Sequence, residues 1–197
     1  MRIICDVDNT LVRTDLVWAD YLYENYDFRL EGKKASDYIS SWSKDDDKLH
    51  YNLTHYTKGM GFDFWTENRG IYDYSLPVED SIEVLWSLSR FYDIILASVV
   101  LGIDLPSKTD FCNFYVPFNK GIVITKQKWL LVKDKEDIII DDRLENFLDK
   151  NGDWVDCNKI LIDTPYEQSI NIKMPDDMHI ASSWSDVHKI ISEKLDL

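Results

Sequence analysis

The chain has 197 residues, of which 45% are hydrophobic and 13% aromatic, and its formal net charge is −14 at pH 7. This much apolar material can form a core, which argues against disorder, and the length suits one domain with or without an insertion. The strong negative charge disfavours general binding to nucleic-acid polymers or anionic membranes, so an anionic ligand would have to meet a metal or a few local cations.

The cysteines and the first residues do not indicate secretion. Cys5, Cys112 and Cys157 are an odd number at wide spacing without a Cys-x-x-Cys pair, which argues against a disulfide framework and a zinc site. No apolar run approaches the ~20 residues of a membrane span, and Asp6 and Asp8 interrupt the first apolar run. We therefore expect a cytoplasmic protein in a reducing compartment, with no membrane partner.

Short apolar runs predict the strands of one sheet. They cover residues 2–7, 93–98, 121–125, 137–142 and 159–163. Continuous apolar strands that alternate with helices are typical of a parallel sheet with both faces covered. The sequence therefore predicts an α/β fold, a Rossmann-like parallel sheet with helices on both faces.

Two helices are indicated by apolar residues at helical spacing. The first follows Pro77, and the second begins at Ser183, a predicted N-cap with Asp186 three residues later. The spaced apolar residues are Ile82, Leu85, Trp86 and Leu88 in the first helix, and Val187, Ile190 and Ile191 in the second.

Residues 15–74 differ from the rest of the chain. They are polar and rich in aromatic residues, they include the segments SKDDDK and GMGFDFW, and they do not repeat the strand pattern. We expect a small helical cap at 15–74, inserted after the first strand into a core made of residues 1–14 and 75–197.

The ends of four predicted strands carry residues that can do chemistry. In chain order they are Asp6 and Asp8, Ser98, Lys126 and Lys128, and Asp141 and Asp142. The carboxyl ends of parallel strands share one edge of the sheet, where ligands bind in such folds. Four carboxylates at one edge need a counter-charge, and Mg²⁺ with oxygen ligands supplies it. An isolated Asp-x-Asp pair would suggest a turn, but the second acidic pair favours a functional site.

These residue types suit phosphoryl transfer. A carboxylate can attack phosphorus and form an aspartyl-phosphate. A second acid two residues along can protonate the leaving oxygen and later activate water. Cations and a hydroxyl group can then position the phosphate and neutralise its charge.

The sequence resembles the haloacid dehalogenase superfamily of aspartate-nucleophile phosphatases. The matching motifs, in order, are DVDNT at 6–10, IILAS at 94–98, a lysine in TKQK at 125–128, and IIIDD at 138–142. Within the superfamily it is similar to the 5′(3′)-deoxyribonucleotidase and 5′-nucleotidase group, on the segments FDFW, IIIDDR and SSWSDVHKII.

The resemblance implies a role for each matching residue. Asp6 would be the nucleophile and a metal ligand, and Asp8 would be the general acid/base and offer its backbone carbonyl to the metal. Ser98 would hold phosphate oxygens. Asp142, supported by Asp141, would complete the Mg²⁺ site.

Two positions depart from the family's pattern. Lys128 fits the motif lysine best, but it lies thirteen residues before Asp141, further than the usual spacing, so Lys126 stays an alternative. Ala97 stands where the nucleotidase group has threonine, which removes one phosphate-holding hydroxyl and bears on the substrate more than on the chemistry.

The sequence thus predicts a Mg²⁺-dependent phosphomonoesterase for nucleoside monophosphates, with Phe64 and Trp65 of the cap as candidate substrate-binding residues. These two aromatic residues could equally pack the cap's own core. One alternative is a phosphatase for another small phosphate or for nucleic-acid 3′ ends, although the net charge counts against a polynucleotide. Another is a catalytically silent binding module, which the presence of Asp8 beside Asp6 disfavours. Base and sugar preference and the oligomeric state stay open, with a homodimer as one option.

Overall fold

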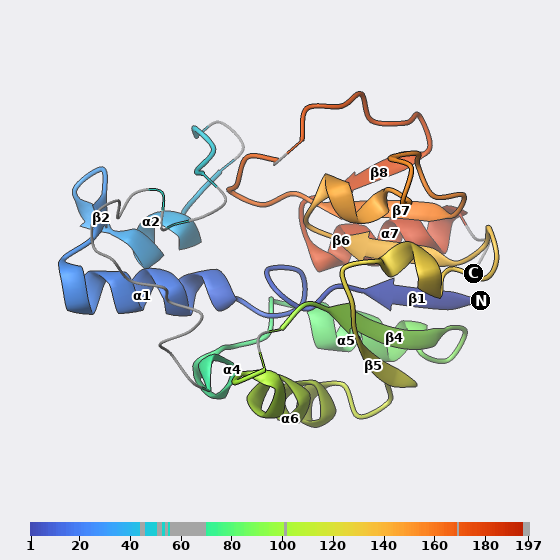
Figure 1. The fold of residues 1–197 in the computed structure, drawn as a ribbon, viewed down its shortest axis with the longest axis horizontal. Coiled ribbons are helices and arrows are strands. Elements are labelled where there is room, and N and C mark those ends of the chain that lie inside the picture. Colours follow the sequence, from blue (N-terminus) through green and yellow to red (C-terminus); the bar gives the residue numbers. More distant parts are fainter. Residues whose placement is uncertain are drawn as a thin grey trace.

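The computed structural model describes residues 1–43, 46–50, 53, 55, 70–100, 102–168 and 170–194. Its strands in the main sheet are β1 (Arg2–Cys5), β4 (Asp93–Ser98), β5 (Gly121–Ile124), β6 (Ile138–Asp141), β7 (Asn158–Ile162) and β8 (Met178–Ala181). They pair in parallel in the order β5-β4-β1-β6-β7-β8. The predicted Rossmann-like α/β fold is confirmed (Figure 1).

Helices lie around the sheet and beside it. They are α1 (Thr14–Tyr26), α2 (Ala35–Ser40), α4 (Ile71–Tyr74), α5 (Ser81–Leu88), α6 (Leu105–Tyr115) and α7 (Trp184–Lys194), with the short 3-10 helices η2 (Lys128–Leu131) and η3 (Leu144–Phe147). None of the described helices combines the length and the hydropathy that a membrane span requires.

The two faces of the sheet form separate parts of the core, because successive side chains of a strand point to opposite faces. On β1, Ile3 and Cys5 join the larger cluster, which includes residues of α5 and α7, whereas Ile4 joins a smaller one with Leu144 and Phe147 of η3. Alpha-helices therefore cover one face, whereas the other face, for which helices were also predicted, is covered by short 3-10 helices with their loops.

The C-terminal helix supports the loop that follows β1. Its N-cap is as expected: the Ser183 hydroxyl accepts from the Asp186 N–H at 3.1 Å, and Asp186 accepts from the Ser182 N–H at 3.0 Å. Trp184 is buried in the core, and its indole N–H donates to the backbone oxygen of Thr10 at 2.8 Å. A residue far along the chain thus holds the loop of the first motif.

One strand of the sheet was not predicted, and one expectation about α5 is wrong. Strand β8 has no predicted counterpart, because at this edge of the sheet Ile180 is exposed and only Ala181 is buried. Trp86 was expected to belong to the apolar stripe of α5, but it is 53% exposed, and the guanidinium of Arg90 lies 4.7 Å from its ring centre. The buried face of α5 is formed by other residues, among them Val84 and Leu85.

The described part of the segment between β1 and α5 extends away from the sheet on the side where β1 ends (Figure 1). It contains α1, α2 and α4 and also a short antiparallel hairpin, β2 (Arg29–Leu30) with β3 (Lys33–Lys34), which the sequence analysis did not predict. Its two-residue turn places Glu31 and Gly32 at φ 48° and 77°, the positive values that such hairpin turns require. Phe64 and Trp65 lie outside the described residues.

Candidate active site

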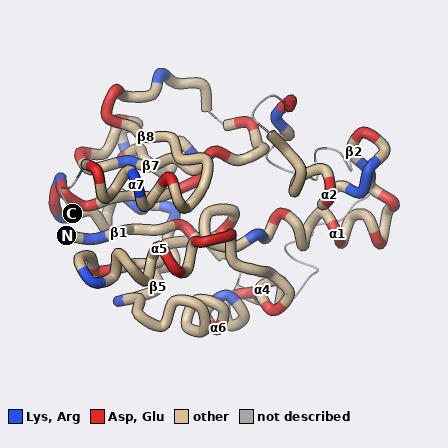
Figure 2. Tube along the Cα trace, turned by 180° about the vertical axis from the view of Figure 1, so that it is seen from behind, with Lys and Arg blue, Asp and Glu red and all other residues tan. Residues whose placement is uncertain are grey.

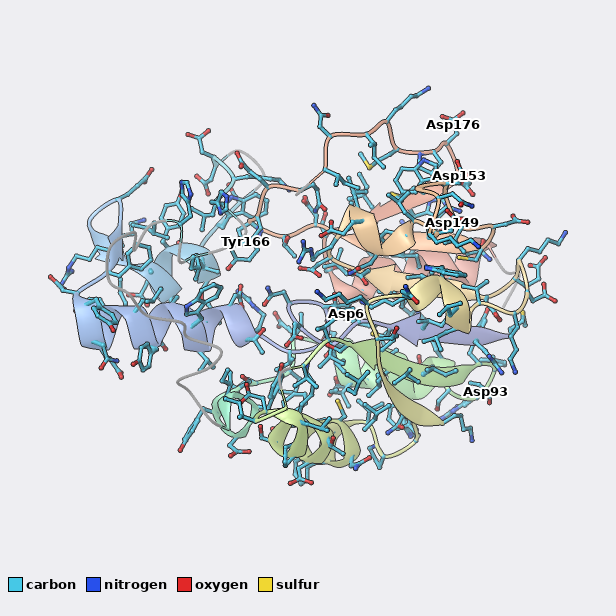
Figure 3. All side chains as sticks on the ribbon, in the orientation of Figure 1. Asp6, Asp93, Asp149, Asp153, Tyr166 and Asp176 are labelled. Atoms are coloured by element: carbon cyan, nitrogen blue, oxygen red, sulfur yellow. The ribbon has the colours of Figure 1, made fainter. Side chains whose placement is uncertain are left out.

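Three buried carboxylates from two neighbouring strands meet at the carboxyl edge of the sheet. Asp6 follows β1, Asp141 ends β6 and Asp142 comes next, and oxygens of all three lie within 4.8 Å of one another. The two strands are held together up to this point, since the Asp6 N–H donates to the Ile140 carbonyl at 2.9 Å. Figure 3 shows Asp6 where β1 ends, on the side that faces the inserted segment.

Lys128 supplies positive charge to this centre. Its Nζ donates to carboxylate oxygens of both Asp6 and Asp141, and its side chain is buried. Burial opposes the ammonium charge, but Asp141 and Asp6 outweigh that effect and raise the pKa of Lys128. Lys126 is exposed at the surface. The structure therefore places Lys128, and not Lys126, among the acids.

The acids of β6 are held by their own loop. The other carboxylate oxygen of Asp141 accepts from the Arg143 N–H at 3.0 Å and from the Asn146 side-chain amide at 2.8 Å. The backbone oxygen of Asp142 accepts from Gln168 at 2.9 Å. The first two bonds fix the orientation of the Asp141 carboxylate, and the bond from Gln168 holds the backbone of Asp142.

The charges of the centre fit a divalent cation. Burial, reinforced by Asp141 and Asp8 and opposed by Lys128, raises the pKa of Asp6 to about 7. Burial and the charges of Asp141 and Asp6 likewise raise the pKa of Asp142 well above its ordinary value. Clustered carboxylates resist ionising together unless a cation offsets their charge. Carboxylate oxygens are also the ligands that Mg²⁺ prefers, so the residues present fit this metal.

Asp8 forms a second group beside the first. One of its carboxylate oxygens accepts from the Tyr72 hydroxyl at 2.7 Å, and the other accepts from the Ser98 hydroxyl at 3.0 Å and from Lys108 Nζ at 2.6 Å. Its side chain keeps 26% of its surface exposed. Ser98 at the end of β4 is therefore next to Asp8, as the motif order predicts for neighbouring strands.

Lys108 and Tyr72 are site residues that the sequence analysis missed. Lys108 lies on α6, where Phe111 and Cys112, three and four residues later, are buried in the core. A lysine at helical spacing from such apolar residues was the available signal. Tyr72 belongs to the short helix α4. This helix reaches Asp8 only because the inserted segment packs against α6.

The burial of Tyr72, and to a lesser extent the charge of Asp8, raise the pKa of its phenol well above the ordinary value. The phenol therefore keeps its proton and stays a hydrogen-bond donor to the carboxylate. The ammonium of Lys108 also lies 4.8 Å from the centre of the Tyr72 ring, which favours the positive charge there.

No family model and no curated protein matches the chain. Several solved structures do match it in three dimensions. YfnB from Bacillus subtilis, determined with bound magnesium, has a TM-score of 0.57 at 11% identity, over 96% of this chain and 97% of its own. A haloacid dehalogenase-like family hydrolase from Streptococcus pneumoniae gives 0.55 at 17% identity, over 96% and 97%.

An L-2-haloacid dehalogenase is also similar, with a TM-score of 0.57 at 14% identity over 96% of this chain and 98% of its own. At such low identities the likeness concerns the architecture of the chain. The chain has the fold of the haloacid dehalogenase-like hydrolases.

Proposed function

We propose that the protein is a Mg²⁺-dependent phosphomonoesterase that hydrolyses nucleoside monophosphates through an aspartyl-phosphate on Asp6. The observation that carries this proposal is the placement of two acids with different surroundings at one strand end. Asp6 lies among the clustered carboxylates with Lys128, and Asp8 lies beside Ser98. Such a pair divides nucleophilic attack and proton transfer between two residues.

In the proposed mechanism Asp8 enters the cycle in its protonated form. Asp6 attacks phosphorus, the bond to the leaving oxygen breaks, and Asp8 gives that oxygen its proton. Asp8 then takes a proton from the water that attacks the aspartyl-phosphate, which releases inorganic phosphate and restores Asp6. Lys128 and the Ser98 hydroxyl hold the phosphate oxygens. Asp6, Asp141 and Asp142 would hold Mg²⁺, which offsets their negative charge and that of the phosphate when it is bound.

Dehalogenation is the second chemistry that the fold allows, because one of the similar structures is a haloacid dehalogenase. A halide leaves without a proton, so a carboxylic acid at the position of Asp8 would have no leaving group to protonate. The bonds from Tyr72, Ser98 and Lys108 hold the carboxyl group of Asp8 in place at the strand end, where a phosphatase would use an acid/base group and a dehalogenase would not. They therefore support the phosphatase.

Charge supports a small substrate. Figure 2 shows the lysines and arginines scattered among acidic residues over the part of the chain drawn in colour. A polynucleotide end would need a cationic track along the backbone. The local cation Lys128, together with the Ser98 hydroxyl, suffices for one phosphate group.

Replacement of the nucleophile tests the proposal most directly. Asp6→Asn should abolish phosphate release from nucleoside monophosphates, because an amide cannot form the acyl-phosphate. Excess chelator should have the same effect on the wild type, and added Mg²⁺ should reverse it. The measurement is free phosphate, with halide release from a 2-haloacid measured in parallel. Full activity of Asp6→Asn, or halide release without phosphate release, would contradict the proposal.

The lysine assignment predicts a large difference between two neighbours. Lys128→Ala should lower kcat/KM by about the 10²- to 10³-fold that the loss of one oxyanion donor costs, because Lys128 faces the phosphate. Lys126→Ala is the matched control and should retain activity, since Lys126 is exposed. Thermal unfolding checks that both variants are folded. If activity collapses only in Lys126→Ala, the assignment is wrong.

Stabilisation by Mg²⁺ should depend on pH. In the metal-free folded protein the pKa of Asp6 is about 7, against 3.8 ordinarily, so the folded state binds this proton more tightly than the unfolded state. Protonation of Asp6 therefore adds to the free energy of unfolding. This contribution is complete below pH ~4 and is lost as the pH rises through ~7. Because Mg²⁺ binds the ionised form, its apparent affinity should weaken about tenfold for each pH unit below the folded pKa, per proton displaced.

The measurement is the increase of Tm caused by Mg²⁺, taken at pH values below and above the folded pKa of Asp6. The increase should be small at the lower pH and large at the higher. Asp142→Asn should reduce it at the higher pH, whereas Asp149→Asn, in an exposed loop outside the centre, should leave it unchanged. An equal increase at both pH values would argue against binding to these carboxylates.

Base recognition is expected from the cap. A base stacked on an aromatic ring contributes ~1–3 kcal/mol, which is about 5- to 150-fold in binding. Trp65→Ala or Phe64→Ala should therefore lower kcat/KM for a nucleoside monophosphate by that factor, while p-nitrophenyl phosphate, which has no base, should be much less affected. Equal losses on both substrates would mean that these residues only pack the cap. No loss on either would favour the alternative of a phosphatase for another small phosphate.

A further inference from the structure

Lys108 is a fully buried lysine whose donors are all used inside the candidate site. Its side chain is 0% exposed. Its Nζ donates to Asp8 at 2.6 Å, to the Ser98 hydroxyl oxygen at 2.6 Å and to the Val99 carbonyl at 2.8 Å. An ammonium has three N–H donors, so each has a partner.

A buried ammonium at this place needs an explanation. Burying a charge is costly unless it is paired and hydrogen-bonded, and an apolar side chain would continue the buried face that Phe111 and Cys112 form on α6. The partners of Lys108 include two residues of the proposed mechanism, Asp8 and Ser98. The free-energy cost of burying the Lys108 ammonium is therefore incurred next to the residues that carry out the proposed chemistry.

The bond from Lys108 fixes the direction in which Ser98 can donate. A serine hydroxyl has one proton and two lone pairs, whereas an ammonium is only a donor. Because Lys108 occupies a lone pair of Ser98, the Ser98 proton must point elsewhere. In this structure it reaches Asp8 at 3.0 Å and the Val99 carbonyl at 3.3 Å. A phosphate oxygen at the strand end is an acceptor that can replace them.

The same ammonium also orients the proposed proton donor. Lys108 and Ser98 both donate to one oxygen of Asp8, and Tyr72 donates to the other. The carboxylate is thus held from both ends, and its rotation would break at least one bond. Lys108 touches both groups and is itself shielded from solvent, so it can align them without meeting the substrate.

We propose that Lys108 is a positioning residue that aligns the Ser98 hydroxyl for the phosphate and the Asp8 carboxylate for the leaving oxygen. This inference rests on the proposed phosphatase function and deepens it. It assigns to α6 a part in the reaction that none of the four sequence motifs contains.

A double-mutant cycle tests whether Lys108 acts through Ser98. Lys108→Met and Ser98→Ala are assayed singly and together, with kcat, KM and the Ki of inorganic phosphate as readouts. Each single change removes the charge-assisted hydrogen bond between Lys108 and Ser98 and should lower kcat/KM by about 10- to 100-fold. Because the two residues form one unit, the double variant should lose little more than the worse single variant. Lys120→Met, at an exposed position, is the matched control and should retain activity.

The KM and Ki readouts separate this role from damage to the fold. Misfolding lowers the active fraction, and therefore the apparent kcat, but leaves KM and the Ki of phosphate unchanged. Loss of the Ser98 alignment should raise both. If Lys108→Met does not fold, Lys108→Gln, which keeps a neutral donor, is expected to lose less activity and to show the same non-additivity with Ser98→Ala.

Three results would overturn the inference while leaving the proposed function intact. They are wild-type activity in Lys108→Met, losses that multiply in the double variant, and a fall in kcat alone. A wild type that neither releases phosphate from nucleoside monophosphates or p-nitrophenyl phosphate nor binds inorganic phosphate would overturn the proposed function itself, and this inference with it.

Discussion

Four carboxylates and two buried lysines share one edge of the sheet, and the balance of their charges constrains everything else at the site. If all six groups ionise, Lys128 and Lys108 offset two of the four negative charges, and a net charge of about −2 is left. A divalent cation would bring that sum close to zero. Without it, some acids must keep protons, as the raised pKa values of Asp6 and Asp142 indicate. The negative charge that remains would repel a phosphate dianion. This charge balance favours binding of the metal before the substrate.

The sheet brings these groups together through its topology. In the order β5-β4-β1-β6-β7-β8, the chain continues from β1 to β4 on one side and later to β6 on the other. The connections therefore leave β1 in opposite directions, and ligands of open parallel sheets bind beyond the strand ends at such a switch point. Asp6 and Asp8 follow the strand at that point, Ser98 ends one neighbour and Asp141 ends the other. Pairing of the strands alone sets most of the site.

This dependence on strand ends explains what could be predicted from sequence. Acids after an apolar run are visible in the sequence, so the positions of Asp6 and Asp141 at one edge follow from fold class. The choice between Lys126 and Lys128 did not follow, because both come after the same strand and only the turn into η2 buries the second. Lys108 and Tyr72 depend on the packing of α6 and α4, which no strand pattern reports. Strand β8 was missed because an edge strand with few buried residues has little apolar signal.

The same geometry limits what the core can recognise. Asp6, Ser98 and Lys128 are committed to the phosphate in the proposed mechanism, and Asp8 to the leaving oxygen, so no core residue among them remains to read the rest of a substrate. That part would extend past Asp8, toward the segment inserted between β1 and α5. Tyr72 comes from this segment and donates directly to Asp8. A leaving group that moved the segment would therefore also move a partner of the proton donor, so substrate fit and proton transfer would be coupled through one hydrogen bond. On this core, a nucleotidase and a general phosphatase would then differ in whether the bound leaving group preserves the hydrogen bond from Tyr72 to Asp8.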